Sequence, residues 1–187
     1  MALKLARTNA EAHVYMELYG CPACGRRRFE PTSALVMVDG DLASRYRGAC
    51  PDCGLEREYV FRVSDEIRLP PVDRARFGDD RPSELIDPGE WMWLADYVSA
   101  RVPVDPATVG PAERDSYRYE LTMAVAAMEE VVKFIPPGAD QVPVDAFWTD
   151  RGREVYARRP GRFIRGAVLA VRDAYQEIVD AYGQAVR

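Results

Sequence analysis

The chain has 187 residues and a formal net charge of −5, with 29% of its residues charged. No apolar stretch approaches the roughly 20 residues that a membrane-spanning helix needs, and the N-terminal stretch lacks the apolar core of a secretory signal. The acidic balance argues against a general nucleic-acid coat, which needs a net basic surface. We therefore expect a cytoplasmic protein without a membrane segment. The strong preference for arginine over lysine is typical of a GC-rich bacterial genome.

The N-terminal third of the chain is expected to be rich in β-strands. Apolar and polar residues alternate from His13 to Leu18, which predicts a strand with the single histidine on its exposed side. Farther along, Asp39 and Gly40 predict a type I′ hairpin turn, which needs positive φ at both central residues. The other expected strands lie at about 34–38, 42–49 and 55–63.

All four cysteines lie in two motifs of the same form, Cys-Pro-x-Cys-Gly. Two thiolates separated by two residues can bind one ion from the same side, and the following glycine tolerates the positive φ of a tight turn. Two such pairs complete a tetrahedral shell of four sulfurs, which leaves no position for a catalytic water and does not need His13 as a ligand. The sequence therefore predicts a structural metal site with the ligands Cys21, Cys24, Cys50 and Cys53.

The order of strand, cysteine motif, hairpin, cysteine motif and strand, over about residues 14–63, resembles a zinc ribbon. The resemblance implies a structural Zn(II) at the four cysteines, and for so small a module the metal would supply much of the folding free energy. Rubredoxins hold iron on comparable motifs, so the spacing alone leaves both zinc and iron open. The resemblance implies no substrate.

The second half of the chain has a different pattern. Periodicity is lost between residues 64 and 88, where prolines and acidic residues predict a connector. We expect a zinc-ribbon β module at 1–68, an acidic connector at 69–87 and an α-helical domain at 88–187. The expected fold class is therefore α+β, with an N-terminal antiparallel β zinc ribbon followed by a small α-helical bundle.

The first helix of this second half has a clear start signal. Asp87 is the predicted N-cap, and Glu90 follows it at capping-box spacing. Trp93 lies outside the apolar stripe, so it is a candidate partner anchor, with packing on the zinc-ribbon module as the alternative. The residues expected to form the buried stripe are Trp91, Leu94, Tyr97, Val98 and Val102.

Three more helices are expected. The longest begins at Pro111 and ends before Pro136, and its acidic residues, Glu129 and Glu130 among them, are expected on the solvent side. A short helix is predicted at about 150–158. The last helix is predicted to start at Pro160, and its apolar stripe, which includes Ile164, matches that of the longest helix, which predicts an antiparallel pair.

Arginines are concentrated between residues 151 and 172, where the only acid is Glu154. One interpretation is a surface that binds an anion, either nucleic acid or an acidic protein partner. The other interpretation is that these arginines pair with the acidic stretch at 65–96 and join the two halves of the chain. The arginines concerned are Arg151, Arg153, Arg158, Arg159, Arg162, Arg165 and Arg172.

The sequence has no recognisable catalytic motif. It lacks a glycine-rich phosphate loop, a G-x-S-x-G motif, an H-E-x-x-H motif and any cysteine outside the metal motifs. We therefore predict a non-catalytic cytoplasmic binding protein that acts through a protein partner, in general character an immunity-type or inhibitor-type protein. The alternative is a nucleic-acid-associated zinc-ribbon factor that uses the arginine-rich surface. A carboxylate-based active site between the two halves is a third possibility.

Overall fold

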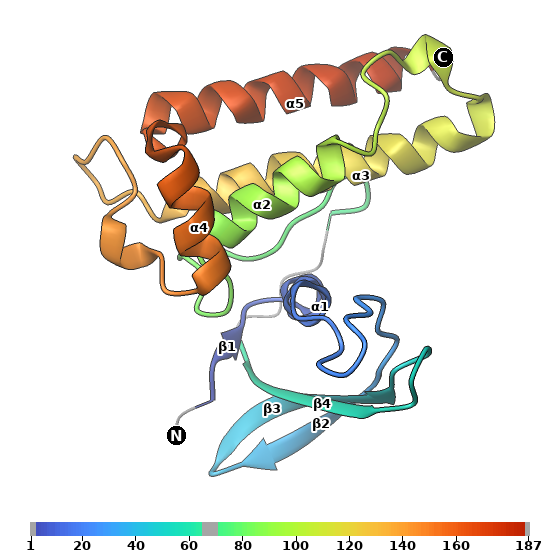
Figure 1. The fold of residues 1–187 in the computed structure, drawn as a ribbon, viewed down its shortest axis with the longest axis vertical. Helices are drawn as coiled ribbons and strands as arrows, with labels where there is room; N and C mark the ends of the chain where they lie inside the picture. Colours follow the sequence, from blue (N-terminus) through green and yellow to red (C-terminus); the bar gives the residue numbers. More distant parts are fainter. Residues whose placement is uncertain (1–2, 65–70, 186–187) are drawn as a thin grey trace. The chain divides into compact units, whose positions relative to one another are not determined.

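The computed structural model describes residues 3–64 and 71–185, and its fold class is α+β, as predicted (Figure 1). The chain divides into two compact units. The first consists of Met1–Arg68, Phe77–Asp79 and Ser83–Leu85, and the second of Leu69–Arg76, Asp80–Pro82 and Ile86–Arg187. The expected connector therefore contributes to both units in turn. Its first two residues, 69 and 70, lie outside the described part of the chain.

The first unit contains a four-stranded sheet in the order β1-β4-β3-β2. The turn between β2 and β3 has φ angles of 52° at Asp39 and 93° at Gly40, so the predicted hairpin is confirmed. β3 pairs antiparallel with both β2 and β4, whereas the short β1 pairs parallel with β4. The strands are β1 (Leu5–Ala6), β2 (Thr32–Val38), β3 (Asp41–Ala49) and β4 (Glu56–Val63).

The strand predicted from His13 to Leu18 is wrong, because this segment belongs to the helix α1 (Asn9–Leu18). Thr8 caps the helix by accepting a 3.1 Å hydrogen bond from the backbone N–H of Glu11. The Glu11 carboxylate is fully buried and binds the guanidinium of Arg7, whose backbone N–H also donates to it at 2.8 Å. The cap at Thr8 favours a helix more strongly than the six-residue alternation favours a strand. The alternating apolar residues Val14, Met16 and Leu18 are buried on more than one side of the helix.

The second unit is built from four helices, α2 (Pro88–Ser99), α3 (Pro111–Lys133), α4 (Asp150–Arg158) and α5 (Arg165–Ala185). The two longest helices, α3 and α5, lie side by side and antiparallel, α2 packs against α3, and α4 packs against α2 (Figure 1). A buried apolar cluster joins α3 and α5 with the segment that follows α2. Its members are Val102, Val109, Leu121, Val125, Val179 and Tyr182.

Asp87 is the N-cap of α2, as predicted, and it also fixes the start of α4. One carboxylate oxygen accepts from the backbone N–H of Glu90 at 2.9 Å, and the other accepts from the N–H and hydroxyl of Thr149 at 2.8 and 2.7 Å. The two helix starts approach closely, since a Cβ added at Gly89 would lie 2.5 Å from the Cα of Gly152. A fully buried carboxylate therefore joins two helices that are 62 residues apart in sequence.

Three details of the predicted helices are wrong. Tyr97 is 41% exposed and stacks on Trp93, so it lies outside the buried stripe, whereas the next residue, Val98, is buried as expected. Glu130 is buried and accepts a 2.5 Å hydrogen bond from Lys133, so it does not lie on the solvent side of α3. The last helix starts at Arg165, after a 3₁₀ turn at Pro160–Phe163, and this change of period leaves Ile164 exposed.

Candidate metal centre

The two cysteine motifs form the same local structure, a tight knuckle closed by backbone hydrogen bonds. The Cys21 N–H donates to the carbonyl of Arg26 at 2.7 Å, and the Gly25 N–H donates to the Cys21 carbonyl at 2.7 Å. The second knuckle repeats this pattern at 2.9 Å for both bonds, between Cys50, Leu55 and Gly54. Gly25 and Gly54 have φ angles of 75° and 73°, a region that strains other residues. The glycine of each motif is therefore required by its turn.

The knuckles bring the four sulfurs together. The first follows α1 and the second connects β3 to β4, and the four sulfur atoms lie within 4.8 Å of one another. The Sγ atoms of Cys21 and Cys53 are 3.5 Å apart, and those of Cys24 and Cys50 are 3.6 Å apart. A tetrahedral ion with metal–sulfur bonds of about 2.3 Å needs sulfur separations of about 3.8 Å. The geometry fits one four-coordinate metal ion.

The four thiols divide into two kinds. Cys21 and Cys50 are buried, whereas Cys24 and Cys53 are exposed. Burial opposes ionisation of Cys21, but the N–H groups of Ala23 and Cys24 and the neighbouring thiols outweigh it and lower its pKa to about 6. At Cys24 the Arg26 N–H favours the thiolate, but partial desolvation within the cluster and the three adjacent sulfurs raise the pKa to about 12. A cation is what would allow all four sulfurs to be thiolates together.

Arg57, on β4, supports this region, although no local pattern in the sequence distinguishes it from the other arginines. Its side chain is buried, and its guanidinium lies 4.3 Å from the ring centre of Phe29. One guanidinium nitrogen donates to the carbonyls of Met16 and Tyr19 at 2.9 and 2.6 Å, at the C-terminal end of α1. A cation is favourable at a helix C-terminus. The Arg57 guanidinium attaches the end of α1, which directly precedes the first knuckle, to β4. Only the contact across the fold reveals this role.

The fold and this cluster define the class: an α+β protein with a four-cysteine cluster positioned to hold a metal ion. Within the described residues, the cluster includes neither a carboxylate nor His13, which instead lies edge-on to Tyr46 with a ring separation of 5.6 Å. Among the described helices, none is long and apolar enough to span a membrane. The chain matches no model of a known protein family, no curated protein and no solved structure.

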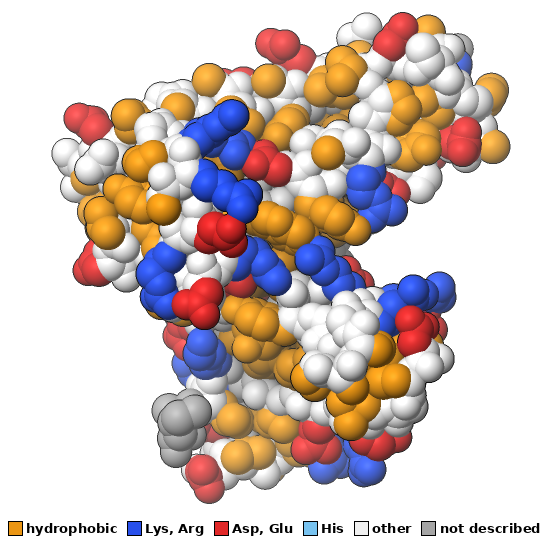
Figure 2. Space-filling view, viewed as in Figure 1, with side chains coloured by type: hydrophobic (Ala, Val, Ile, Leu, Met, Phe, Trp, Pro, Cys, Tyr) orange, Lys and Arg blue, Asp and Glu red, His pale blue; other side chains and the backbone are white. Residues whose placement is uncertain are grey.

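The arginines predicted as a binding surface lie in the second unit, and acidic side chains are interspersed with them (Figure 2). Two of them contact acids of α2. Arg162 binds the carboxylate of Asp96 through two hydrogen bonds of 2.6 and 2.7 Å, and this pairing raises the pKa of the guanidinium. Arg151 lies 3.4 Å from the buried carboxylate of Glu90. These two pairs join α2 to the segment that follows α3.

The other arginines of this surface have mostly local partners. Arg165 donates to the backbone carbonyls of Pro136 and Ala139 at 3.4 and 3.2 Å. Arg159 is exposed at the end of α4. Three arginines form ion pairs with acids one to four residues away, two of which lie just outside the 151–172 window: these pairs are Arg153–Asp150, Arg158–Glu154 and Arg172–Asp173.

Trp93, the candidate partner anchor, is half-buried on α2. Its ring stacks on Tyr97, with centroids 5.0 Å apart and planes inclined by 14°. The guanidinium of Arg151 lies 5.0 Å from the centre of the indole, within the range of a cation–π contact. The indole is therefore part of a packed cluster on the surface of the second unit.

Proposed function

We propose that this chain is a non-catalytic binding protein in which a structural Zn(II) ion fixes the first unit, and that it acts through a protein partner. The observation that carries the proposal is the set of four sulfurs, all within 4.8 Å of one another, from two knuckles of the same geometry. Four thiolates complete the coordination of zinc, so the metal has no open position for a substrate or an activated water.

Zinc fits this donor set better than the other common ions. Four thiolates in a tetrahedral arrangement select zinc or iron over calcium and magnesium, which prefer oxygen ligands. Tetrahedral tetrathiolate sites without an electron-transfer partner are most often structural zinc sites. The cytoplasm is the expected location, because a reducing compartment keeps the thiols available for metal.

The charge distribution supports a protein partner over nucleic acid. The formal net charge is −5, and most of the arginines between 151 and 172 already contact carboxylates or carbonyls. A phosphate backbone would have to compete with these internal acceptors. An acidic binding protein suits a basic partner, which is the arrangement of a stoichiometric inhibitor or immunity protein.

The first test is the metal itself. Protein purified without added chelator is expected to contain about one zinc per chain by elemental analysis. It should also be colourless, because Zn(II) has a filled d shell, whereas a ferric tetrathiolate is coloured. Removal of the metal should be accompanied by exposure of four titratable thiols. Material with four free thiols and no bound metal, or with iron in place of zinc, would contradict the assignment.

The second test separates the two partner classes. The zinc-loaded full chain is immobilised and exposed to native lysate, with and without nuclease, and then washed at low and high salt. A protein partner should be retained in stoichiometric amount after nuclease treatment. Retention of nucleic acid alone, with affinity that falls steeply as salt rises, would favour the nucleic-acid-associated factor instead.

A further inference from the structure

The edge strand β2 is unusually apolar and exposed. Within the described part of the chain β2 pairs only with β3, so its other side is a free edge of the sheet. Leu35 and Met37 are 67% and 66% exposed, and Leu42, opposite Met37 on β3, is 47% exposed. Residues directly opposite one another on paired strands lie on the same face, so these three side chains form one surface patch. β2 itself, Thr32–Val38, contains no charged residue.

Alternate residues of β2 direct their backbone N–H and C=O groups toward the free edge of the sheet. Val38 and Asp41 flank a two-residue type I′ turn and so form a hydrogen-bonded pair, after which hydrogen-bonded and non-hydrogen-bonded pairs alternate along the hairpin. Ser33, Leu35 and Met37 fall in the non-hydrogen-bonded pairs. Their N–H and C=O groups therefore point away from β3, toward the free edge.

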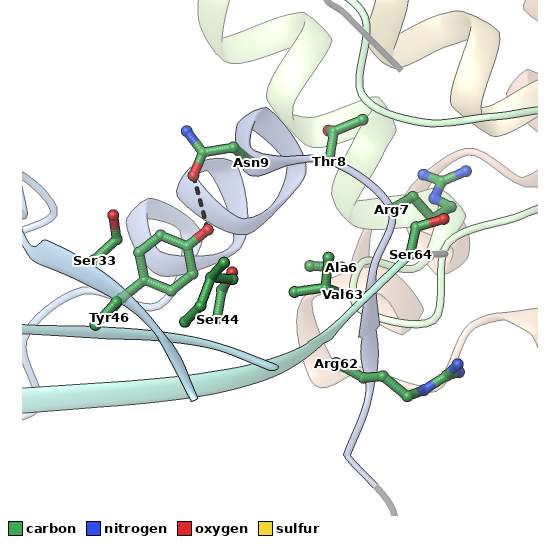
Figure 3. A pocket seen from close by; sticks show the side chains of 12 residues that line it. Ala6, Arg7, Thr8, Asn9, Ser33, Ser44, Tyr46, Arg62, Val63 and Ser64 are labelled. Carbon is green, nitrogen blue, oxygen red and sulfur yellow. Dashed lines mark hydrogen bonds between the residues drawn. The ribbon is translucent and has the colours of Figure 1, made fainter. Parts of the chain in front are cut away.

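A cavity opens on the same face of the sheet, beside the patch. Its volume is about 340 Å³, and Ser33 and Leu35 belong to its wall. Figure 3 shows that Tyr46 extends from β3 toward the start of α1, where its hydroxyl donates to the Asn9 side chain at 2.7 Å. Ser44, opposite Leu35, lines the floor. The cavity is thus bordered by the edge strand, by α1 and by the middle of the sheet.

The charges that flank β2 are complementary to a second copy of the strand running in the opposite direction. Residues 26–31 hold three arginines and one acid, Glu30, whereas acids follow β2 at Asp39 and Asp41. Arg28 pairs with Glu30, and Arg26 lies 3.6 Å from Asp52, but both pairs are exposed to solvent and therefore weak, and the segment before β2 keeps an excess of positive charge. Antiparallel pairing brings the basic end of one strand to the acidic end of the other, twice in a symmetric pair. Parallel pairing would place like charges together.

We propose that β2 is a self-association site at which two copies of this chain pair their β2 strands antiparallel about a two-fold axis at Leu35. The outward groups of Ser33, Leu35 and Met37 would then form about six backbone hydrogen bonds, and the two sheets would become one. Leu35 lies opposite its own counterpart. Met37 lies opposite Ser33 of the second copy, at the mouth of the cavity. This inference goes beyond the proposed function and does not depend on the identity of the metal.

The oligomeric state of the zinc-loaded full chain tests the inference. Sedimentation equilibrium over a wide concentration range is expected to show a monomer–dimer equilibrium. Met37→Lys should weaken the dimer about tenfold or more, because a lysine on an edge strand opposes strand pairing. Val104→Lys is the matched control, since Val104 is 73% exposed in a loop of the second unit, and it should leave the equilibrium unchanged.

A paired substitution tests the register. Ser33→Glu alone should also weaken the dimer, but Ser33→Glu combined with Met37→Lys should restore it to within about threefold, because each glutamate then faces a lysine of the second copy. The two positions lie four residues apart on one strand, too far for the same effect within one chain. Zinc content and the circular dichroism spectrum establish that every variant is folded.

Three results would overturn the inference. One is a chain that stays monomeric at all concentrations. Another is a dimer that neither single substitution weakens, or that the double substitution fails to restore. The third is a monomer whose Met37→Lys variant loses a protein that the unmodified chain captures, because the strand would then bind a partner and not a second copy. None of these results bears on the zinc assignment, so the two proposals fail separately.

Discussion

The two units of this chain are stabilised in different ways. The second unit has two long helices with a continuous apolar interface, in which Leu121 is 1% exposed and Tyr182 is fully buried. The first unit places one short helix on a small sheet, and five of the seven residues of β2 are exposed. Its second stabilising feature is the cysteine cluster, which links the segment after α1 to the β3–β4 connection. The first unit does have an apolar core, which includes Met16, Leu18 and Phe61, and a metal ion at the cluster would add to the stability that this small core provides.

The largest expected effect comes from breaking the metal site. Cys24→Ser, or treatment of the unmodified chain with a strong zinc chelator, should unfold the first unit and leave the second unit folded. Structural zinc contributes about 10–16 kcal/mol of apparent folding free energy in finger peptides, more than a small sheet can supply otherwise. Hydrogen exchange measured by mass spectrometry should show loss of protection in β2, β3 and β4 and retained protection in α3 and α5. Equal loss in both units would contradict the division.

The next largest effect is expected in the core of the helical unit. Met128 on α3 is fully buried, so Met128→Ala should lower the free energy of unfolding of this unit by about 2–5 kcal/mol. The zinc content should not change. Val144→Ala, at a position that is 61% exposed, is the control and should cost less than about 0.5 kcal/mol. Thermal unfolding with zinc present measures both. Loss of zinc from the Met128→Ala variant would show that the first unit does not fold independently of the second.

A smaller effect is expected at the buried helix cap. Asp87→Ala removes an acceptor from two helix starts and leaves buried N–H groups unpaired, which should cost about 1–3 kcal/mol in the second unit. Asp105 provides the comparison, because it caps only an exposed 3₁₀ turn through one bond to Ala107. Asp105→Ala should cost about 1 kcal/mol or less. Denaturant unfolding of the second unit measures both, and equal costs would show that the buried position of Asp87 adds nothing.

The smallest effect is expected for the arginine surface. Arg162→Gln removes the two hydrogen bonds to Asp96, but both side chains are partly exposed, so the loss of stability should be about 1 kcal/mol or less. If the same substitution weakened capture of a partner more than tenfold while stability changed this little, the surface would be a binding site. Unchanged capture would leave Arg162 with the internal role of joining the 3₁₀ turn before α5 to α2. Arg158→Gln, at an exposed local pair, is the control.

The features that the sequence predicted correctly depend on local chemistry. The hairpin turn requires positive φ at adjacent residues, and each knuckle requires its glycine, so the sequence alone placed the four sulfurs in one cluster. The strand predicted from His13 to Leu18 failed because alternation over six residues does not exclude a helix. The spacing of Thr8 and Glu11 was an overlooked capping signal.

Other features depend on contacts that no local pattern contains. Arg57 supports the metal region through carbonyls about 40 positions earlier in the chain, and nothing in its own neighbourhood indicates this. Arg162 binds Asp96, which lies at the end of the acidic stretch 65–96, but both residues belong to the second unit, so this pair does not join the two halves of the chain. Such pairings are set by the packing of the helices, so a sequence shows that an arginine needs a partner but not which residue provides it.

Gly89 and Gly152 meet at the corner between α2 and α4, and neither residue has a side chain that could adjust the contact. Main chain touches main chain there, and an added methyl group would lie inside the van der Waals radius of its neighbour. Side chains at ordinary helix contacts can change rotamer to absorb a displacement, whereas bare backbone has nothing to rearrange. The approach of α2 to α4 at this corner is therefore limited by direct contact between the two backbones, on the helix that also carries the aromatic cluster around Trp93.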